Sequence, residues 1–296
     1  MKLTVFAAAV FAAALFALNM TGQNGTVPQG DVVYQCPMDP DVRSNKEGVC
    51  SRCGMKLRSG IPEPIEFPVD LKVAPRAPRP GAKTELEFTV RDPQNDRQIE
   101  HFELVHEKLL HLFVISKDLK FFVHDHPVFG DDGKFRYDLA FPKSGLYRLL
   151  ADFYPEGATP QLIAKTVIVP GEAQQTPALA RDYAVKQTEN MRVSLETDPP
   201  QPIAGQKTMM FFRLDPADGI EKYIGAWGHM LAASDDLIDL IHTHPFIADA
   251  SPEKTGPQMQ FNMYFPRERT YRIWVQFQRK GVVNTAQFDI PVQDLR

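Results

Sequence analysis

Three cysteines lie within eighteen residues near the start of the printed sequence, and the rest of the chain has none. Cys50 and Cys53 belong to a Cys-x-x-Cys-Gly segment, in which a tight turn holds two sulfurs side by side. Cys36 offers a third sulfur from the other side of a short loop. A segment this short buries too little surface to fold alone, and a bound metal would supply the missing stabilisation. We therefore predict a metal site at Cys36, Cys50 and Cys53.

Three sulfurs leave a fourth ligand position, for which Met38, Asp39 and Met55 are the nearby candidates. A thioether suits Cu(I), whereas a carboxylate suits zinc, so the expected ion is copper or zinc. Two alternatives remain for the cysteines. One is a purely structural zinc knuckle, and the other is a redox-active pair, which fits less well because no thioredoxin-like strand and helix pattern surrounds it.

The cysteine segment resembles the heavy-metal-binding domain found in soft-metal efflux adaptors and copper-transporting P-type ATPases. The resemblance covers roughly residues 33–58 and rests on Tyr-Gln-Cys-Pro-Met-Asp-Pro-Asp-Val-Arg from Tyr34 and Gly-Val-Cys-Ser-Arg-Cys-Gly-Met-Lys-Leu from Gly48. It implies metal binding and makes a metal efflux or uptake component a candidate partner. Where the family usually has histidine after Cys-Pro-Met, this chain has Asp39, so its metal preference need not follow the family.

Histidines supply a second set of candidate ligands, and they occur in an internal repeat. The pattern His-x12-His-x-His-Pro appears twice, with an offset of 118 residues. Farther along, Phe-Pro, Tyr-Arg and Phe of segment 141–153 recur in segment 265–277 with an offset of 124, so six residues are inserted in the second copy after Pro245. These downstream pairs are expected to be fold landmarks. The repeated triplets contain six of the eight histidines: His111, His124 and His126, then His229, His242 and His244.

Each triplet should converge if its segment forms a β-hairpin. In a hairpin that turns through residues 117–120, His111 faces His126 and Phe113 faces His124. Opposed residues of an antiparallel pair point to the same side, and so do residues two apart. Three imidazoles would then meet at the open end of each hairpin, where they suit Cu(II) or Zn(II).

Two further histidines precede the first triplet and have no counterpart in the second copy. His106 is a candidate fourth ligand of the first triplet, whereas His101 is expected on the surface. A competing interpretation is that the triplets are packed and hydrogen-bonded on a sandwich face without metal. The recurrence of all three positions gives metal ligation equal standing with that interpretation.

Alternating apolar and polar residues dominate the long part of the chain. Phe135, Tyr137 and Leu139 alternate with charged residues. In the second copy Ile273, Val275 and Phe277 alternate with Arg272, Trp274 and Gln276. This alternation is typical of half-buried strands separated by Gly, Pro and Asp turns. We predict a mainly β protein, in which a metal knuckle precedes two tandem β-sandwiches of Ig-like or cupredoxin-like type. The expected boundaries are 31–58 for the knuckle, 59–82 for a proline-rich linker overlapping the first sandwich, 65–170 for that sandwich, 171–182 for a second linker and 183–296 for the second sandwich.

Residues 1–20 are typical of an export signal, because Lys2 precedes an apolar run, Thr4 to Leu18, of the length of a signal h-region. The expected location is periplasmic or secreted, with an uncleaved N-terminal anchor as the alternative and no other integral membrane segment. The net charge of −4, without a basic patch, argues against a nucleic-acid partner.

The leading functional hypothesis is an exported protein that binds copper, or zinc, for sequestration, sensing or handover, and that is not an enzyme. The alternative is a tandem β-sandwich interaction module with a purely structural zinc knuckle. A copper-dependent oxidase is least favoured, because no Asp, Glu or Tyr constellation recurs beside the triplets, and no Ser-His-Asp pattern, phosphate loop or dinucleotide fingerprint is present.

Overall fold

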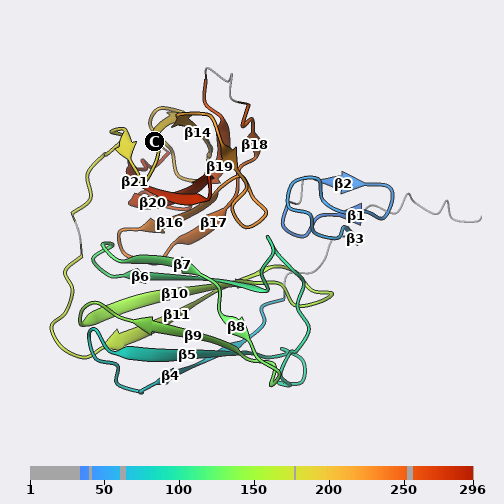
Figure 1. Cartoon of the computed structure of the whole chain (residues 1–296). Helices are drawn as coiled ribbons and strands as arrows, with labels where there is room; N and C mark the ends of the chain where they lie inside the picture. The colour runs from blue at the N-terminus through green and yellow to red at the C-terminus, as the bar shows by residue number, and fades with distance from the viewer. Residues whose placement is uncertain (1–33, 40–41, 61–64, 177, 252–255, 296) are drawn as a thin grey trace, which may run out of the picture.

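A computed structural model describes residues 34–39, 42–60, 65–176, 178–251 and 256–295 (Figure 1). The predicted export signal at 1–20 and the first residues of the predicted knuckle lie outside these ranges. The described residues form antiparallel strands, and among them no helix long and apolar enough to cross a membrane is found. The prediction of a mainly β protein with two tandem domains behind an N-terminal knuckle is confirmed.

The first sandwich has two four-stranded sheets, β4-β5-β9-β8 and β11-β10-β6-β7. Alternate apolar residues of the two sheets fill one core, which includes Phe88, Phe135 and Phe153. The bounds of the strands are β4 (Val69–Ala74), β5 (Lys83–Val90), β6 (Leu110–Ser116), β7 (Phe122–Asp125), β8 (Val128–Phe129), β9 (Phe135–Ala140), β10 (Gly145–Phe153) and β11 (Gln161–Val169).

The second sandwich repeats this plan with the sheets β12-β13-β14-β19-β18 and β15-β20-β16-β17, and β21 pairs with β20. Its own core includes Phe212, Phe261 and Phe277. The bounds are β12 (Lys186–Gln187), β13 (Arg192–Asp198), β14 (Lys207–Asp215), β15 (Ile220–Glu221), β16 (His229–Ser234), β17 (Leu240–Thr243), β18 (Ile247–Ala248), β19 (Met259–Tyr264), β20 (Thr270–Arg279) and β21 (Val282–Pro291).

Within the proline-rich stretch 59–82, the part that overlaps the predicted first sandwich contains a strand of that sandwich. Residues 69–74 form β4, which pairs with β5 along its whole length. Pro68 precedes this strand and Pro75 follows it, and β4 lies at the edge of its sheet. Prolines are compatible with a strand at such positions, because they remove no hydrogen bond from the centre of the ladder.

Both histidine-bearing hairpins form in the predicted register. In the first hairpin, Phe113 of β6 pairs with His124 of β7. In the second, Leu231 of β16 pairs with His242 of β17. Leu119 and Leu237 occupy equivalent turn positions, with φ of 55° and 58°. The repeat in the sequence is therefore a repeat of one hairpin geometry.

The two sandwiches pack against each other through the sheets that carry these hairpins (Figure 1). Phe113 and Leu150 of the first sandwich meet Leu231 and Trp274 of the second in one apolar cluster. As a result every residue of β6 and β16 is buried. The alternation in β20 had indicated a half-buried strand, but Trp274 is buried as well, because the neighbouring domain covers the second face.

The knuckle contains three short strands, β1 (Tyr34–Gln35), β2 (Arg43–Ser44) and β3 (Arg58–Ser59), and it contacts both sandwiches (Figure 1). Met55 packs against Val105 and Tyr154 of the first sandwich. The guanidinium of Arg52 lies 4.4 Å from the ring centroid of Phe246 in the second. The cysteine segment therefore lies across the junction of the two domains.

Replacing Trp274 with alanine tests the packing between the domains. The indole stacks on the ring of Phe122 across the junction, with centroids 4.8 Å apart and an interplanar angle of 6°. We expect Trp274→Ala to lower the free energy of unfolding by about 3–5 kcal/mol, because it opens a cavity in a buried cluster. Urea denaturation followed by circular dichroism measures this loss. The control is Ile168→Ala, at a side chain that is 66% exposed; equal effects of the two substitutions would contradict the interface.

Candidate metal centres

The three cysteine sulfurs converge inside the knuckle and form no disulfide. The Sγ atoms of Cys36 and Cys53 are 3.4 Å apart. Two thiolates on one tetrahedral ion, with metal–sulfur bonds of about 2.3 Å, would lie about 3.7 Å apart. The ligand atoms of Cys36, Cys50, Cys53 and Asp39 all lie within 4.8 Å of one another. The spacing of these atoms therefore fits a single small ion.

Among the three candidates for the fourth position, Asp39 reaches the sulfurs. Its Oδ2 lies 3.3 Å from Sγ of Cys50 and 3.8 Å from Sγ of Cys36, and its Oδ1 accepts a hydrogen bond of 2.9 Å from Arg52. Met55 is buried against the first sandwich. Met38 lies beside Cys53 at the edge of a cavity between the domains.

The protonation states of the thiols favour a single thiolate before metal binds. Hydrogen bonding from Cys53 lowers the pKa of the Cys36 thiol to about 6. The same contact, together with burial, raises the pKa of Cys53, and burial raises that of Cys50. A metal ion that binds all three sulfurs must therefore displace protons, and its affinity rises with pH.

The first histidine triplet is oriented by a two-residue turn at 105–108. The carbonyl oxygen of Val105 accepts a hydrogen bond of 2.9 Å from Nε2 of His111. A carbonyl oxygen only accepts, so Nε2 carries the proton and Nδ1 of a neutral ring is left bare. Similarly, Nδ1 of His124 donates to Oε1 of Gln276 over 2.6 Å, which leaves Nε2 of His124 bare.

These two bare nitrogens point at each other. Nδ1 of His111 lies 3.1 Å from Nε2 of His124 and 3.2 Å from Nε2 of His126. His126 can donate to His111, but no proton is available between His111 and His124. Two lone pairs at this distance repel unless a cation lies between them. Ligand nitrogens on a tetrahedral ion with bonds of about 2.0–2.1 Å are about 3.3 Å apart, so a metal ion fits the space.

The second triplet has the same construction. Nε2 of His229 donates to the carbonyl oxygen of Tyr223 over 2.9 Å, and Nδ1 of His229 lies 3.1 Å from Nε2 of His244. Nδ1 of His242 donates to Oδ2 of Asp152 over 2.5 Å. The remaining Nε2 of His242 is buried and has no hydrogen-bond partner. A buried nitrogen lone pair without a hydrogen-bond partner needs an explanation, and a second unprotonated nitrogen lies in the same triplet. Two such lone pairs can serve as ligands of one metal ion.

Each triplet is completed by a residue of the other sandwich. Asp152 of β10 holds His242 of the second domain, and Gln276 of β20 holds His124 of the first. Within their own domains, Asp152 pairs with His111 and Gln276 pairs with His229. The sequence analysis did not identify these two residues, although the offset of 124 that relates the downstream repeat also relates Asp152 to Gln276.

The two triplets lie side by side across the domain junction. The ring centroids of His124 and His229 are 5.2 Å apart, and those of His111 and His242 are 5.8 Å apart. Centroids within a triplet are separated by similar distances, 4.8 Å for His111 and His126. The two triplets therefore form one six-histidine cluster.

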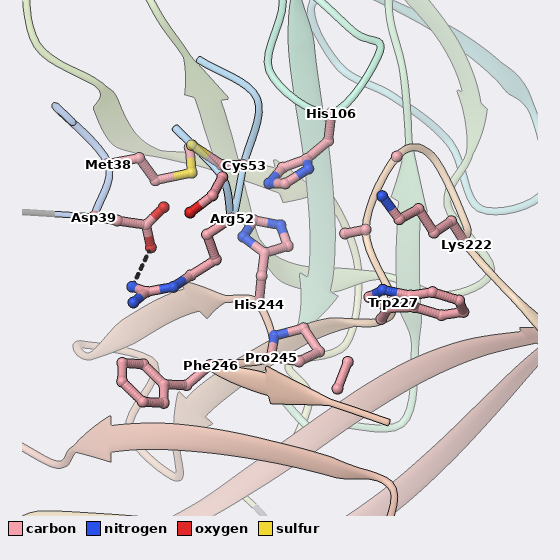
Figure 2. A pocket seen from close by; sticks show the side chains of 14 residues that line it. Met38, Asp39, Arg52, Cys53, His106, Lys222, Trp227, His244, Pro245 and Phe246 are labelled. Carbon is pink, nitrogen blue, oxygen red and sulfur yellow. Dashed lines mark hydrogen bonds and ion pairs between the residues drawn. The ribbon is translucent and has the colours of Figure 1, made fainter. Parts of the chain in front are cut away.

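His106 does not belong to the first triplet, which corrects the prediction of a fourth ligand there. Its ring centroid is 3.9 Å from that of His244 in the second triplet, against 6.4 Å from that of His111. Its turn carries the side chain across the junction. Figure 2 shows the rings of His106 and His244 next to each other, with Cys53, Met38 and Asp39 to one side of them. His101 is exposed, as predicted.

One cavity joins the cysteine site to the histidine cluster. Cys53, Met38, His106 and His244 all line it, and its volume is about 200 Å³ (Figure 2). Small-molecule sites usually have volumes of about 300–1,000 Å³. The cavity is large enough for an ion and a few waters, and small for an organic substrate.

Comparisons with solved structures find matches at low similarity. The Yersinia pseudotuberculosis adhesin InvE matches at 12% identity and a TM-score of 0.23 over 76% of this chain, which spans 60% of that chain. The Escherichia coli adhesin FdeC matches at 13% and 0.25, over 81% of this chain and 69% of the other. A two-domain fibronectin type-III segment of chicken tenascin matches at 10% and 0.21, over 76% and 99%. At these TM-scores the likeness says nothing about function.

The family comparisons first define the class of the protein. Residues 33–58 match the heavy metal binding domain, so the resemblance noted in the sequence is confirmed, and the chain is a β-domain protein with a metal-binding N-terminal segment. Residues 66–170 and 186–294 each match a domain of unknown function, DUF8832, and together they span well over half of the chain. The chain therefore belongs to the DUF8832 family, with the domain duplicated. No curated protein matches it.

Substituting Asp152 should weaken metal binding at the second triplet more than at the first. The carboxylate makes the His242 imidazole a stronger metal ligand. Groups that hydrogen-bond to a metal-ligating histidine typically contribute 10- to 100-fold in metal affinity. We expect Asp152→Asn to weaken one of the two histidine-bound ions by about 10- to 100-fold, measured by competition with a chromophoric chelator. Asp138→Asn, at an exposed carboxylate of β9, is the control. Equal weakening of both ions would argue against the assigned pairing.

The metal-free protein should lose stability in mild acid. Burial lowers the pKa of His111, His124 and His242 to about 3, whereas the unfolded value is about 6.5. The stability of the metal-free fold is therefore complete above about pH 6.5 and decreases as the pH falls toward 3. Burial raises the pKa of Asp152 to about 6, which opposes one of these losses.

Thermal unfolding of the metal-free chain at pH 7.5, 6 and 5 measures this effect. We expect a loss on the order of several kcal/mol between pH 7 and 5. A double substitution, His111→Leu with His229→Leu, should flatten the dependence. A melting temperature that is constant from pH 7 to 5 would contradict the burial of neutral histidines.

Proposed function

We propose that the protein is an exported copper-binding protein that holds Cu(I) at the cysteine site and at both histidine triplets, for sequestration or handover. The observation that carries the proposal is a pair of bare nitrogens in each triplet, on His111 and His124 and on His229 and His242, next to three converging sulfurs. Export is supported by the apolar run that follows Lys2.

The charge around the triplets favours copper over zinc. Asp152 is the buried carboxylate that faces the cluster. Two divalent ions would place four positive charges beside it in a desolvated site, whereas two Cu(I) ions would place two. Burial of uncompensated charge is costly, so the smaller total charge is favoured. Imidazole ligands suit copper as well as zinc, so the ligand type does not oppose this choice.

We propose further that the ion is cargo and that the protein does not catalyse a reaction. The side chain of His242 is 1% exposed, and His111 and His229 are buried too. The cavity that reaches the cluster is small for an organic substrate. These features support storage or transfer of an ion over turnover of a bound molecule.

A second candidate is a β interaction module with a purely structural zinc in the knuckle. The position of Asp39 favours it, because a carboxylate beside three thiolates completes a donor set that zinc accepts. The knuckle would then stabilise the N-terminal segment and its contact with both domains. The two candidates differ in the metals that they predict for the histidine triplets.

The metal content of the full chain distinguishes the candidates. The protein is exposed to Cu(I) under anaerobic conditions, or to Zn(II), and the bound metal is measured by mass spectrometry after buffer exchange. We expect one Cu(I) at the cysteine site and one at each triplet. Replacement of Cys36, Cys50 and Cys53 with serine should therefore abolish the binding of one ion, and His111→Leu combined with His229→Leu should abolish the binding of the other two. One zinc and no copper per chain would overturn the proposal in favour of the interaction module.

A further inference from the structure

His106 is a buried histidine without a hydrogen-bond partner. The residue is only 4% exposed, and neither Nδ1 nor Nε2 of its ring has a hydrogen-bond partner. A neutral imidazole offers one donor and one acceptor, and leaving both unsatisfied in a buried place costs free energy. The position therefore requires an explanation other than the stability of the fold.

The turn that carries His106 does not need histidine. The turn recurs in the second sandwich, where Ile224 stands at the equivalent position. His106 and Ile224 have φ of 47° and 48°, and the flanking bridges Val105–Lys108 and Tyr223–Ala226 match. The same backbone is thus formed with an apolar side chain in one copy, and histidine is an addition in the other.

The ring of His106 lines the cavity that joins the two candidate metal sites, and this cavity is called the passage below. Cys53 and Met38 of the knuckle line the same cavity, and so does His244 of the second triplet, whose ring lies next to that of His106 (Figure 2). The centroids of the His106 and His244 rings are 3.9 Å apart, and those of His106 and His229 are 5.6 Å apart. A ligand in this position can contact an ion that leaves either site.

We propose that His106 is a relay ligand that passes Cu(I) between Cys53 of the knuckle and His244 of the second triplet. This inference rests on the proposed function. Met38 contributes a thioether at the cysteine end of the same passage. His106 holds the ion only in transit, so it affects the rate of exchange between the sites and leaves the number of bound ions unchanged.

The relay is a ligand exchange and involves no electron transfer. One nitrogen of His106 binds a Cu(I) ion held by the thiolates, and a copper–sulfur bond then breaks. The released thiolate takes a proton from water. A nitrogen of His244 next forms a bond to the same ion, and the bond to His106 breaks. Copper remains monovalent throughout, and the reverse sequence returns it to the thiolates.

The variant His106→Ile tests the relay with little risk to the fold, because Ile224 already occupies this turn in the second domain. The full chain is loaded with Cu(I) and mixed in a stopped-flow instrument with bicinchoninate, a chelator too large for the cavity. We expect a fast phase, in which the thiolate-to-copper absorption disappears, and a slow phase that releases the histidine-bound copper. His106→Ile should slow the second phase by about tenfold or more and leave the first phase and the total copper unchanged.

Two further variants make the result specific. Cys53→Ser should also slow the second phase, because it removes the other end of the passage. His101→Ile, at an exposed histidine outside both sites, should change neither phase. Equal second-phase rates in His106→Ile and the unaltered chain would overturn the relay while leaving copper binding intact. Loss of one bound ion in His106→Ile would overturn it too, since His106 would then be a permanent ligand. Absence of copper from the unaltered chain would instead refute the proposed function.

Discussion

The architecture of the site depends on imidazole nitrogens that carry no proton. They carry none because the other nitrogen of each ring donates its hydrogen bond to a group that can only accept one. The carbonyl oxygens of Val105 and Tyr223 each fix the proton of the first histidine on the outer nitrogen. In the first triplet the inner nitrogen of His111 then faces the bare Nε2 of His124 at 3.1 Å without a proton between them. Burial makes this arrangement costly and keeps the rings neutral, so a cation at the centre would relieve the repulsion.

Packing of the two sandwiches is part of the site, because neither domain contains a complete set of partners. Asp152 and Gln276 each orient a histidine of the other domain. The apolar cluster around Phe113 and Trp274 holds the two sheets in this relation. The knuckle contacts both domains at the same end, so the cysteine site, the junction and the histidine cluster form one continuous structure.

Sequence patterns were sufficient for local geometry and insufficient for relations between domains. The hairpin register followed from the turn placed at residues 117–120, because the turn fixes which residues are opposed and opposed residues in a ladder share a face. The resemblance around Cys36 located the knuckle. By contrast, the contact of His106 with His244 and the role of Asp152 depend on how two sheets face each other. Alternation within one strand carries no such information.

The two copies of the domain differ at two positions that lie beside the histidine triplets. Asp152 stands where the other copy has Gln276, and His106 stands where the other copy has Ile224. A carboxylate behind His242 raises the ligand basicity of that imidazole more than an amide raises that of His124, so under the proposed function the second triplet would bind an ion more tightly than the first. His106 lies beside this second triplet. An ion that entered from the knuckle would then meet the tighter triplet first, and the first triplet would fill once that position was occupied.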